Sequence, residues 1–110
     1  MKLPNSEKAA IDERKVREYL LSTSHPVGRF KARFFASIGF GPGNWQVLAK
    51  AIVLVAATGD AELVQDNEYG RKYLVPGLLT GPEGRSADVV SIWIVRAGSD
   101  TPRLVTVYPR

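Results

Sequence analysis

The spacing of the hydrophobic residues changes near residue 60, and this change restricts the fold more than any other feature of the sequence. Before it, apolar side chains recur every three or four residues, as on one face of a helix. After it, they alternate residue by residue, as in a strand with one buried face. Helices followed by hairpin-connected strands predict an α+β domain, with two to three N-terminal helices packed on a C-terminal antiparallel sheet of three to four strands.

Three helices are expected, over residues 12–21, 26–37 and 45–57. Pro26 suits a first helical turn, Gly39 a C-cap and Asn44 an N-cap. Strands are expected over residues 70–79, 87–96 and 103–108, with glycine-containing turns between them. Residues 60–68 are ambiguous between a loop and a short edge strand around residues 62–64. We expect one domain over residues 1–110.

Composition removes several classes of chemistry. The chain has no cysteine and one histidine, which excludes disulfides, a thiol nucleophile, a thiolate zinc site and any multi-histidine metal site. We therefore expect no metal and no cofactor. The longest apolar run, residues 51–57, is far short of the ~20 residues that span a bilayer. The first residues lack the apolar run of a secretory signal, so we expect a cytoplasmic protein without membrane association.

Positive charge is concentrated in the first half. Residues 1–59 carry nine Lys/Arg and four acids, a net charge of +5, whereas residues 60–110 have a net charge of −1. No acid lies between Tyr19 and Gly59. Basic residues without acidic neighbours produce a positive field that favours a polyanion. A solvated basic helix face is the alternative interpretation.

Lys31 departs from the pattern of its helix. With Val27 at zero and about 100° per residue, Lys31 lies near 40°, inside the arc occupied by Phe35 and Ile38. The side chain must therefore extend past the apolar surface to water, pair with an acid, or project into a site. In the last case Lys31 would reach the edge of the sheet, where it could hold a phosphate or stabilise developing negative charge.

Other candidate residues have ordinary alternatives. His25 can titrate near neutral pH, but a lone histidine is usually a surface residue or a helix cap. Strict alternation would place Leu104, Thr106 and Tyr108 on one face of the last strand and Arg103, Val105 and Val107 on the other. Arg71 and Lys72 could add cations to the surface that carries Thr106 and Tyr108, or they could belong to an exposed edge strand. Trp93 could stack a nucleic-acid base, although a strand tryptophan is more often part of the core.

Several segments together resemble a known family. They are residues 1–5, His25-Pro26-Val27-Gly28, Lys31-Ala32-Arg33-Phe34-Phe35, residues 69–73, 81–85 and 93–94, and the ending Pro102-Arg103-Leu104-Val105-Thr106-Val107-Tyr108-Pro109. The resemblance is to small bacterial toxin-like proteins of unassigned function, which stand beside small antitoxin genes or form the C-terminal domain of large secreted toxins. That family in turn resembles the barnase/colicin/RelE-type ribonuclease toxins in element order and in its terminal strand.

The resemblance implies a toxin of a toxin–antitoxin or related conflict system, acting as a metal-independent endoribonuclease that leaves 2′,3′-cyclic phosphate ends. It implies His25, Lys31, Thr106 and Tyr108 as catalytic residues and Arg71, Lys72 and Arg103 as substrate-binding cations. RNA would be the substrate, and a small antitoxin or immunity protein the partner. The absence of a second histidine removes a two-histidine acid–base pair.

Two other functions remain open from the sequence. One is a non-catalytic module that binds a small partner protein or nucleic acid. The other, an antitoxin or immunity protein, fits less well, because inhibitors of basic nucleases tend to be acidic and this chain has a net charge of +4. The oligomeric state and the RNA target do not follow from the sequence.

Overall fold

The structure, a computed structural model, describes residues 1–21 and 28–110. A short 3-10 turn, η1 (Ser6–Lys8), precedes a helix that begins as α1 (Glu13–Lys15) and continues as a π-helical turn, η2 (Val16–Leu20). α2 (Gly28–Ser37) and α3 (Trp45–Thr58) follow, with a second 3-10 turn, η3 (Pro42–Asn44), between them. The three expected helices are confirmed; Pro26 lies outside the described residues.

The caps of α2 and α3 agree with the sequence prediction only in part. Gly39 follows α2 with a φ of 98°, a left-handed conformation that glycine adopts without strain. Asn44 was expected to cap α3, but its side chain binds the preceding turn instead. It accepts a hydrogen bond from the Gly41 N–H at 2.7 Å and donates one to the Gly39 carbonyl at 3.1 Å. The amide therefore holds the turn between the helices rather than the first turn of α3.

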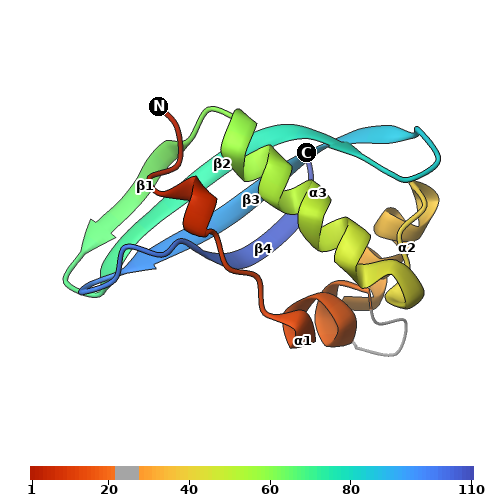
Figure 1. The fold of residues 1–110 in the computed structure, drawn as a ribbon, viewed down its shortest axis with the longest axis horizontal. Coiled ribbons are helices and arrows are strands. Elements are labelled where there is room, and N and C mark those ends of the chain that lie inside the picture. Colours follow the sequence, from red (N-terminus) through yellow and green to blue (C-terminus); the bar gives the residue numbers. More distant parts are fainter. Residues whose placement is uncertain (22–27) are drawn as a thin grey trace.

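Four antiparallel strands form one sheet in the order β1-β2-β3-β4 (Figure 1). They are β1 (Glu62–Asn67), β2 (Gly70–Thr80), β3 (Ser86–Arg96) and β4 (Arg103–Pro109). The ambiguous segment is thus a strand, and the α+β fold with a C-terminal antiparallel sheet is confirmed. Both edge strands contain a shift of register: in β1 between Leu63 and Gln65, and in β4 where it pairs with Ile92 and Trp93.

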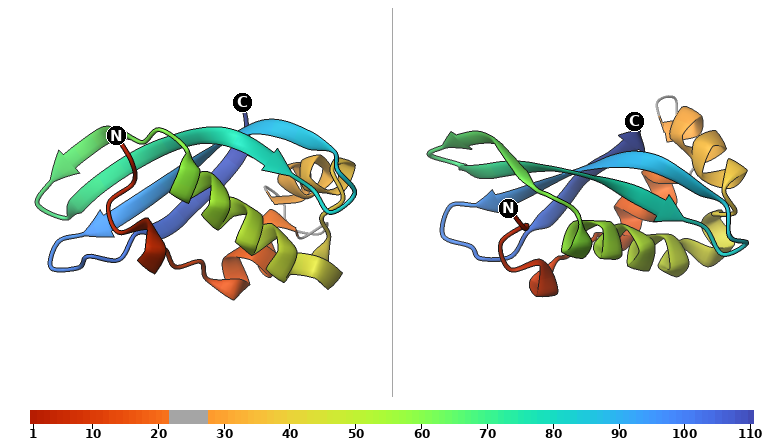
Figure 2. Two further views of the ribbon diagram at one scale, coloured as in Figure 1. Left: turned by 45° about the horizontal axis from the view of Figure 1, so that its top comes forward. Right: turned by 90° about the horizontal axis from the view of Figure 1, so that it is seen from above.

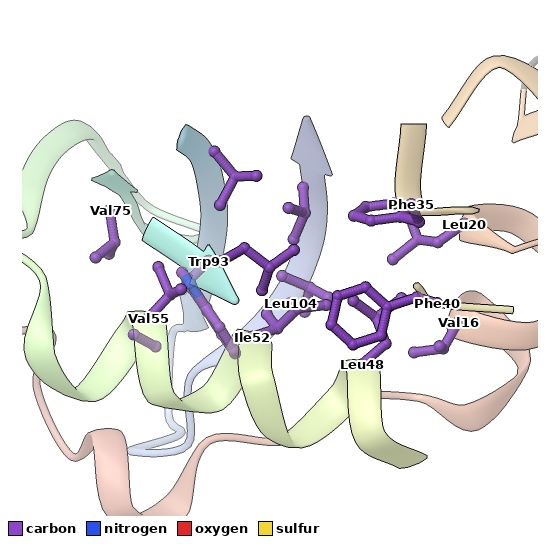
Figure 3. Packing of buried hydrophobic residues seen from close by; sticks show 14 of the residues in the cluster. Val16, Leu20, Phe35, Phe40, Leu48, Ile52, Val55, Val75, Trp93 and Leu104 are labelled. Carbon is purple, nitrogen blue, oxygen red and sulfur yellow. The ribbon is translucent and has the colours of Figure 1, made fainter. Parts of the chain in front are cut away.

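α3 covers one face of the sheet, and the core lies between them (Figures 1 and 3). Trp93 is fully buried there, and its indole Nε1 donates a hydrogen bond to Ser91 Oγ at 2.8 Å. Ser91 in turn donates to the Val75 carbonyl at 3.0 Å. Of the two interpretations of Trp93, the core position is confirmed, and the possibility that it stacks a nucleic-acid base is wrong because this ring has no exposed surface.

α2 lies on the other side of the sheet from α3, beside the C-terminal part of β4 (Figure 2). Its apolar face, with Phe35 and Ile38, packs into the same core cluster as η2. The turn between β2 and β3 fixes its end: an ideal Cβ on Gly81 would lie 1.6 Å from the Ile38 carbonyl oxygen. Only glycine allows this close approach. The position of α2 is therefore determined by both the core and the hairpin.

A β-bulge corrects the expected faces of β4. Thr106 pairs with Ile92 and Leu104 pairs with Trp93, so Val105 is an extra residue in the strand. Leu104 and Val107 consequently both point into the core, where each is buried. Thr106 and Tyr108 lie on the opposite face with Arg103. The prediction from strict alternation placed Thr106 and Tyr108 on the same face of β4 as Leu104. This prediction is wrong because the bulge at Val105 interrupts the alternation of side chains.

We call the face of the sheet away from α3 the second face. Pairing of the strands arranges it in rows: Lys72, Ile94 and Arg103 form one row, Leu74, Ile92 and Thr106 the next, and Pro76, Val90 and Tyr108 a third. Adjacent rows are about 7 Å apart, because two residues of a strand separate them.

Among the described residues, no helix is long and apolar enough to cross a membrane.

Candidate functional site

Lys31 and Thr106 meet although 75 positions separate them in the sequence. The Lys31 ammonium reaches from α2 to the second face, where Nζ donates a hydrogen bond to Thr106 Oγ1 at 2.5 Å. Both side chains are partly buried. The prediction that a lysine inside the apolar arc of this helix would be delivered to the sheet is therefore confirmed in its geometry.

The surroundings of Lys31 contain an aromatic ring and a second lysine. Nζ lies 5.2 Å from the centroid of the Tyr19 ring, within the range of a cation–π interaction. Burial lowers the pKa of Lys31, and the positive charge of Lys15 lowers it further. No ion pair between Lys31 and a described acidic residue is present. Lys31 thus carries a positive charge that is poorly solvated and not neutralised by any described carboxylate.

Lys15 and Tyr19 are site residues that the sequence prediction missed. They are four residues apart on the helix formed by α1 and η2, so they share one helical face. That face is directed toward α2 and β4, as their relation to Lys31 shows. Their spacing of four residues is visible in the sequence, but it does not show that this helical face meets α2.

A hollow of about 570 Å³ adjoins this site along β4. We call it the basic groove. It is lined by residues 10–12, which pair with the beginning of β4, by residues 103–105 of β4 and by Ile94 of β3. Its basic side chains are Lys15, Lys72, Arg96 and Arg103. Asp12 is the acid of the groove, and its carboxylate caps α1 by accepting a hydrogen bond from the Arg14 N–H at 2.9 Å. The groove therefore carries an excess of positive charge.

A family model matches residues 2–110 and is described as a domain of unknown function, DUF6883. The chain belongs to this family. The DUF6883 fold is similar to that of a chain in a contact-dependent growth inhibition toxin–immunity protein complex from Klebsiella pneumoniae 342, with a TM-score of 0.71. The two chains are 18% identical, and the match covers 91% of this chain and 98% of the other. No curated protein matches this sequence.

Of the other predicted site residues of this DUF6883 chain, some lie on the second face of the sheet near Lys31 and Thr106 and others do not. Lys72 and Arg103 lie in one row of the second face and line the basic groove together. Tyr108 is on the same face as Thr106, one row farther along the strand. Arg71 points to the other side of β2 and forms an ion pair with Asp66 at 3.4 Å, so it does not join them. His25 lies outside the described residues.

The arrangement suits an anion. An ammonium group has three N–H donors, of which Lys31 uses one on Thr106. The Thr106 hydroxyl accepts that bond and keeps its own hydrogen for another acceptor. Within residues 1–21 and 28–110, no group of three or more histidine, cysteine or acidic side chains gathers that could hold a metal ion. The described side chains thus present hydrogen-bond donors and positive charge to a single surface.

Proposed function

We propose that this chain is the toxin of a bacterial conflict system and acts as a metal-independent endoribonuclease. The observation that carries the proposal is the hydrogen bond between Lys31 and Thr106, beside a groove that is lined by cations and by Val105, the neighbour of Thr106. Phosphodiester cleavage places negative charge on the non-bridging phosphate oxygens, and donors fixed beforehand at that position stabilise the transition state.

In the proposed reaction the RNA supplies its own nucleophile. The 2′-hydroxyl gives up its proton to a base, the bond from O2′ to phosphorus forms, and the bond from phosphorus to O5′ breaks. O5′ takes a proton, which leaves a 2′,3′-cyclic phosphate and a 5′-hydroxyl. Lys31 would hold a non-bridging oxygen with its free N–H donors, and Thr106 would donate its hydroxyl hydrogen to the same phosphate.

Proton transfer needs an acid and a base besides these donors. His25 is our candidate from the sequence, because its ordinary pKa lies nearest to neutrality. Tyr108 can orient the phosphate or the ribose from the neighbouring row of the second face. The lowered pKa of Lys31 makes its proton easier to release than that of an exposed lysine, so Lys31 is a second candidate for proton transfer.

Two observations support the proposal, and the second favours the toxin over its inhibitor. The fold is similar to that of a chain from a toxin–immunity protein complex, which supports membership of such a pair. The net charge of +4 supports the nuclease side, because a nuclease binds a polyanion and its inhibitor has to match the same basic surface. We accordingly propose a small, acidic immunity protein as partner.

The test is incubation of the purified protein with total RNA and with tRNA in EDTA, beside Lys31→Met. Lys50→Met is the matched control, because Lys50 is an exposed lysine on α3, across the sheet from the site. We expect cleavage by the wild type and the Lys50 variant, with cyclic-phosphate ends, and none by Lys31→Met. Absence of cleavage by the wild type on every RNA would refute the enzyme and favour a non-catalytic module that binds a partner.

A further inference from the structure

The basic groove has cations of its own, distinct from the Lys31–Thr106 pair. Arg103 and Lys72 lie on either side of Ile94 in one row of the second face. Two strand spacings separate their backbones, about 10 Å, so two long side chains can close on one group between them. Thr106 occupies the next row, which lies two residues, about 7 Å, farther along β3. Neither Lys31 nor Thr106 is among the residues that line the groove, so the groove and the Lys31–Thr106 pair are neighbouring places on this surface.

Among the described residues, the four cations of the groove form no salt bridge. The ion pairs found among the described residues use other bases, namely Lys8, Arg14, Arg17, Arg71 and Arg85. In the groove, the carboxylate of Asp12, which also caps α1, offsets one of the four positive charges. Four positive side chains around one hollow repel each other, and a bound polyanion would relieve that repulsion.

Lys15 connects the groove to the site. It lines the groove, and its charge also lowers the pKa of Lys31. The positive field is therefore continuous from Arg103 and Lys72, past Lys15, to Lys31. A ligand that follows this path must carry negative charges at intervals, as a polynucleotide backbone does.

We infer that the basic groove is a second anion site, which binds a phosphate adjacent to the one held by Lys31 and Thr106. This inference rests on the proposed function, because it assigns both phosphates to one nucleic-acid strand. The hollow gathers four cations around Ile94 and lies beside the strand that carries Thr106, so it suits an extended polynucleotide with charges at intervals better than the surface of a folded acidic protein. The groove therefore makes the protein selective for oligonucleotides over dinucleotides.

Binding of uncleavable DNA oligonucleotides tests the groove separately from cleavage. The probes are a deoxythymidine dinucleotide with one phosphate and a hexamer, both measured by fluorescence anisotropy. The variants are Lys72→Gln and Arg103→Gln, with Lys50→Gln as the control of equal charge. Circular dichroism verifies that each variant is folded.

We expect Lys72→Gln and Arg103→Gln each to weaken hexamer binding about tenfold, and Lys50→Gln to have little effect. Each groove variant should also reduce the slope of log affinity against log salt by about 0.7. Affinity for the dinucleotide should stay as in the wild type, because that probe needs only Lys31 and Thr106.

Three results would overturn the inference. One is unchanged hexamer binding by both groove variants. Another is an equal loss for the hexamer and the dinucleotide, which would make the groove part of the first site. The third uses polyglutamate as an additional probe: a larger loss of affinity for polyglutamate than for the hexamer would assign the groove to an acidic polypeptide. Selective hexamer binding without RNA cleavage would instead refute the proposed enzyme and leave the second anion site intact.

Discussion

Replacing Thr106 with valine removes a hydroxyl and keeps the shape of the side chain. The hydroxyl accepts a hydrogen bond from Lys31 at 2.5 Å and is only partly buried, so the loss should reduce folding stability by less than about 1 kcal/mol. In the transition state, a hydrogen bond to a charged group contributes about 1.5–3 kcal/mol. Since each 1.36 kcal/mol is about tenfold in rate, Thr106→Val should lower kcat/KM about 10- to 100-fold.

The same calculation for Lys31 gives a larger loss. Lys31→Met removes a fixed positive donor, and loss of one such group costs about 10²–10³ in rate. If the two side chains hold one phosphate as a unit, the double variant should be no slower than Lys31→Met alone. Thr106→Ser, which keeps the hydroxyl, should retain most of the activity.

The assay is cleavage of a short fluorescent RNA in EDTA under conditions that give kcat and KM separately. Thermal unfolding of each variant checks that the fold is retained. Two outcomes would refute the reasoning. In one, the losses of the single variants multiply in the double variant, which would show that the residues act independently. In the other, Thr106→Val cleaves as fast as the wild type.

Three further predictions concern stability and pH. Ser91→Ala leaves the buried Nε1 of Trp93 without an acceptor and should lower the unfolding free energy by about 1–3 kcal/mol; an unchanged denaturation midpoint would contradict this. Gly81→Ala places a Cβ against the Ile38 carbonyl and should cost about 1–3 kcal/mol, seen as a lower Tm with reduced activity. Burial lowers the pKa of Lys31, so its unfolded form binds more protons in the alkaline range below 10.5. In that range the unfolding free energy of the wild type should increase relative to that of Lys31→Met as pH rises. Activity that needs the ammonium form of Lys31 should decline over the same range. If the unfolding free energies of the two proteins change in parallel with pH, the shift in the pKa of Lys31 is absent.

The helices and strands followed from local patterns. Lys31 was recognised as unusual because its angular position conflicts with its polarity, a property of one helix that needs no knowledge of the rest of the fold. Its partner Thr106 could be named only as a candidate. The meeting of the two depends on where the hairpin turn at Gly81 holds the end of α2, and no local pattern contains that distance.

The features that sequence reasoning missed depend on the exact register of a strand or on how two helices pack. Val105 interrupts the alternation of β4, and nothing in its side chain distinguishes it from its neighbours. Arg71 and Lys72 were treated as one basic pair, although adjacent strand residues face opposite ways, so only Lys72 reaches the basic groove. Lys15 and Tyr19 reach the site through the packing of two helices, which the sequence does not specify.

The bulge that orients Thr106 also affects whether β4 can pair with the sheet edge of another copy of the molecule. An unpaired edge strand can pair with the edge of another sheet, which leads to aggregation, and an irregular edge resists such pairing. Here both edge strands are irregular, β1 between Leu63 and Gln65 and β4 at Val105. The beginning of β4 is further covered by Ala10, which accepts a hydrogen bond from the Leu104 N–H at 3.2 Å. The extra residue that directs the Thr106 hydroxyl away from the core therefore also makes this edge of the sheet a poor template for pairing with another copy of the chain.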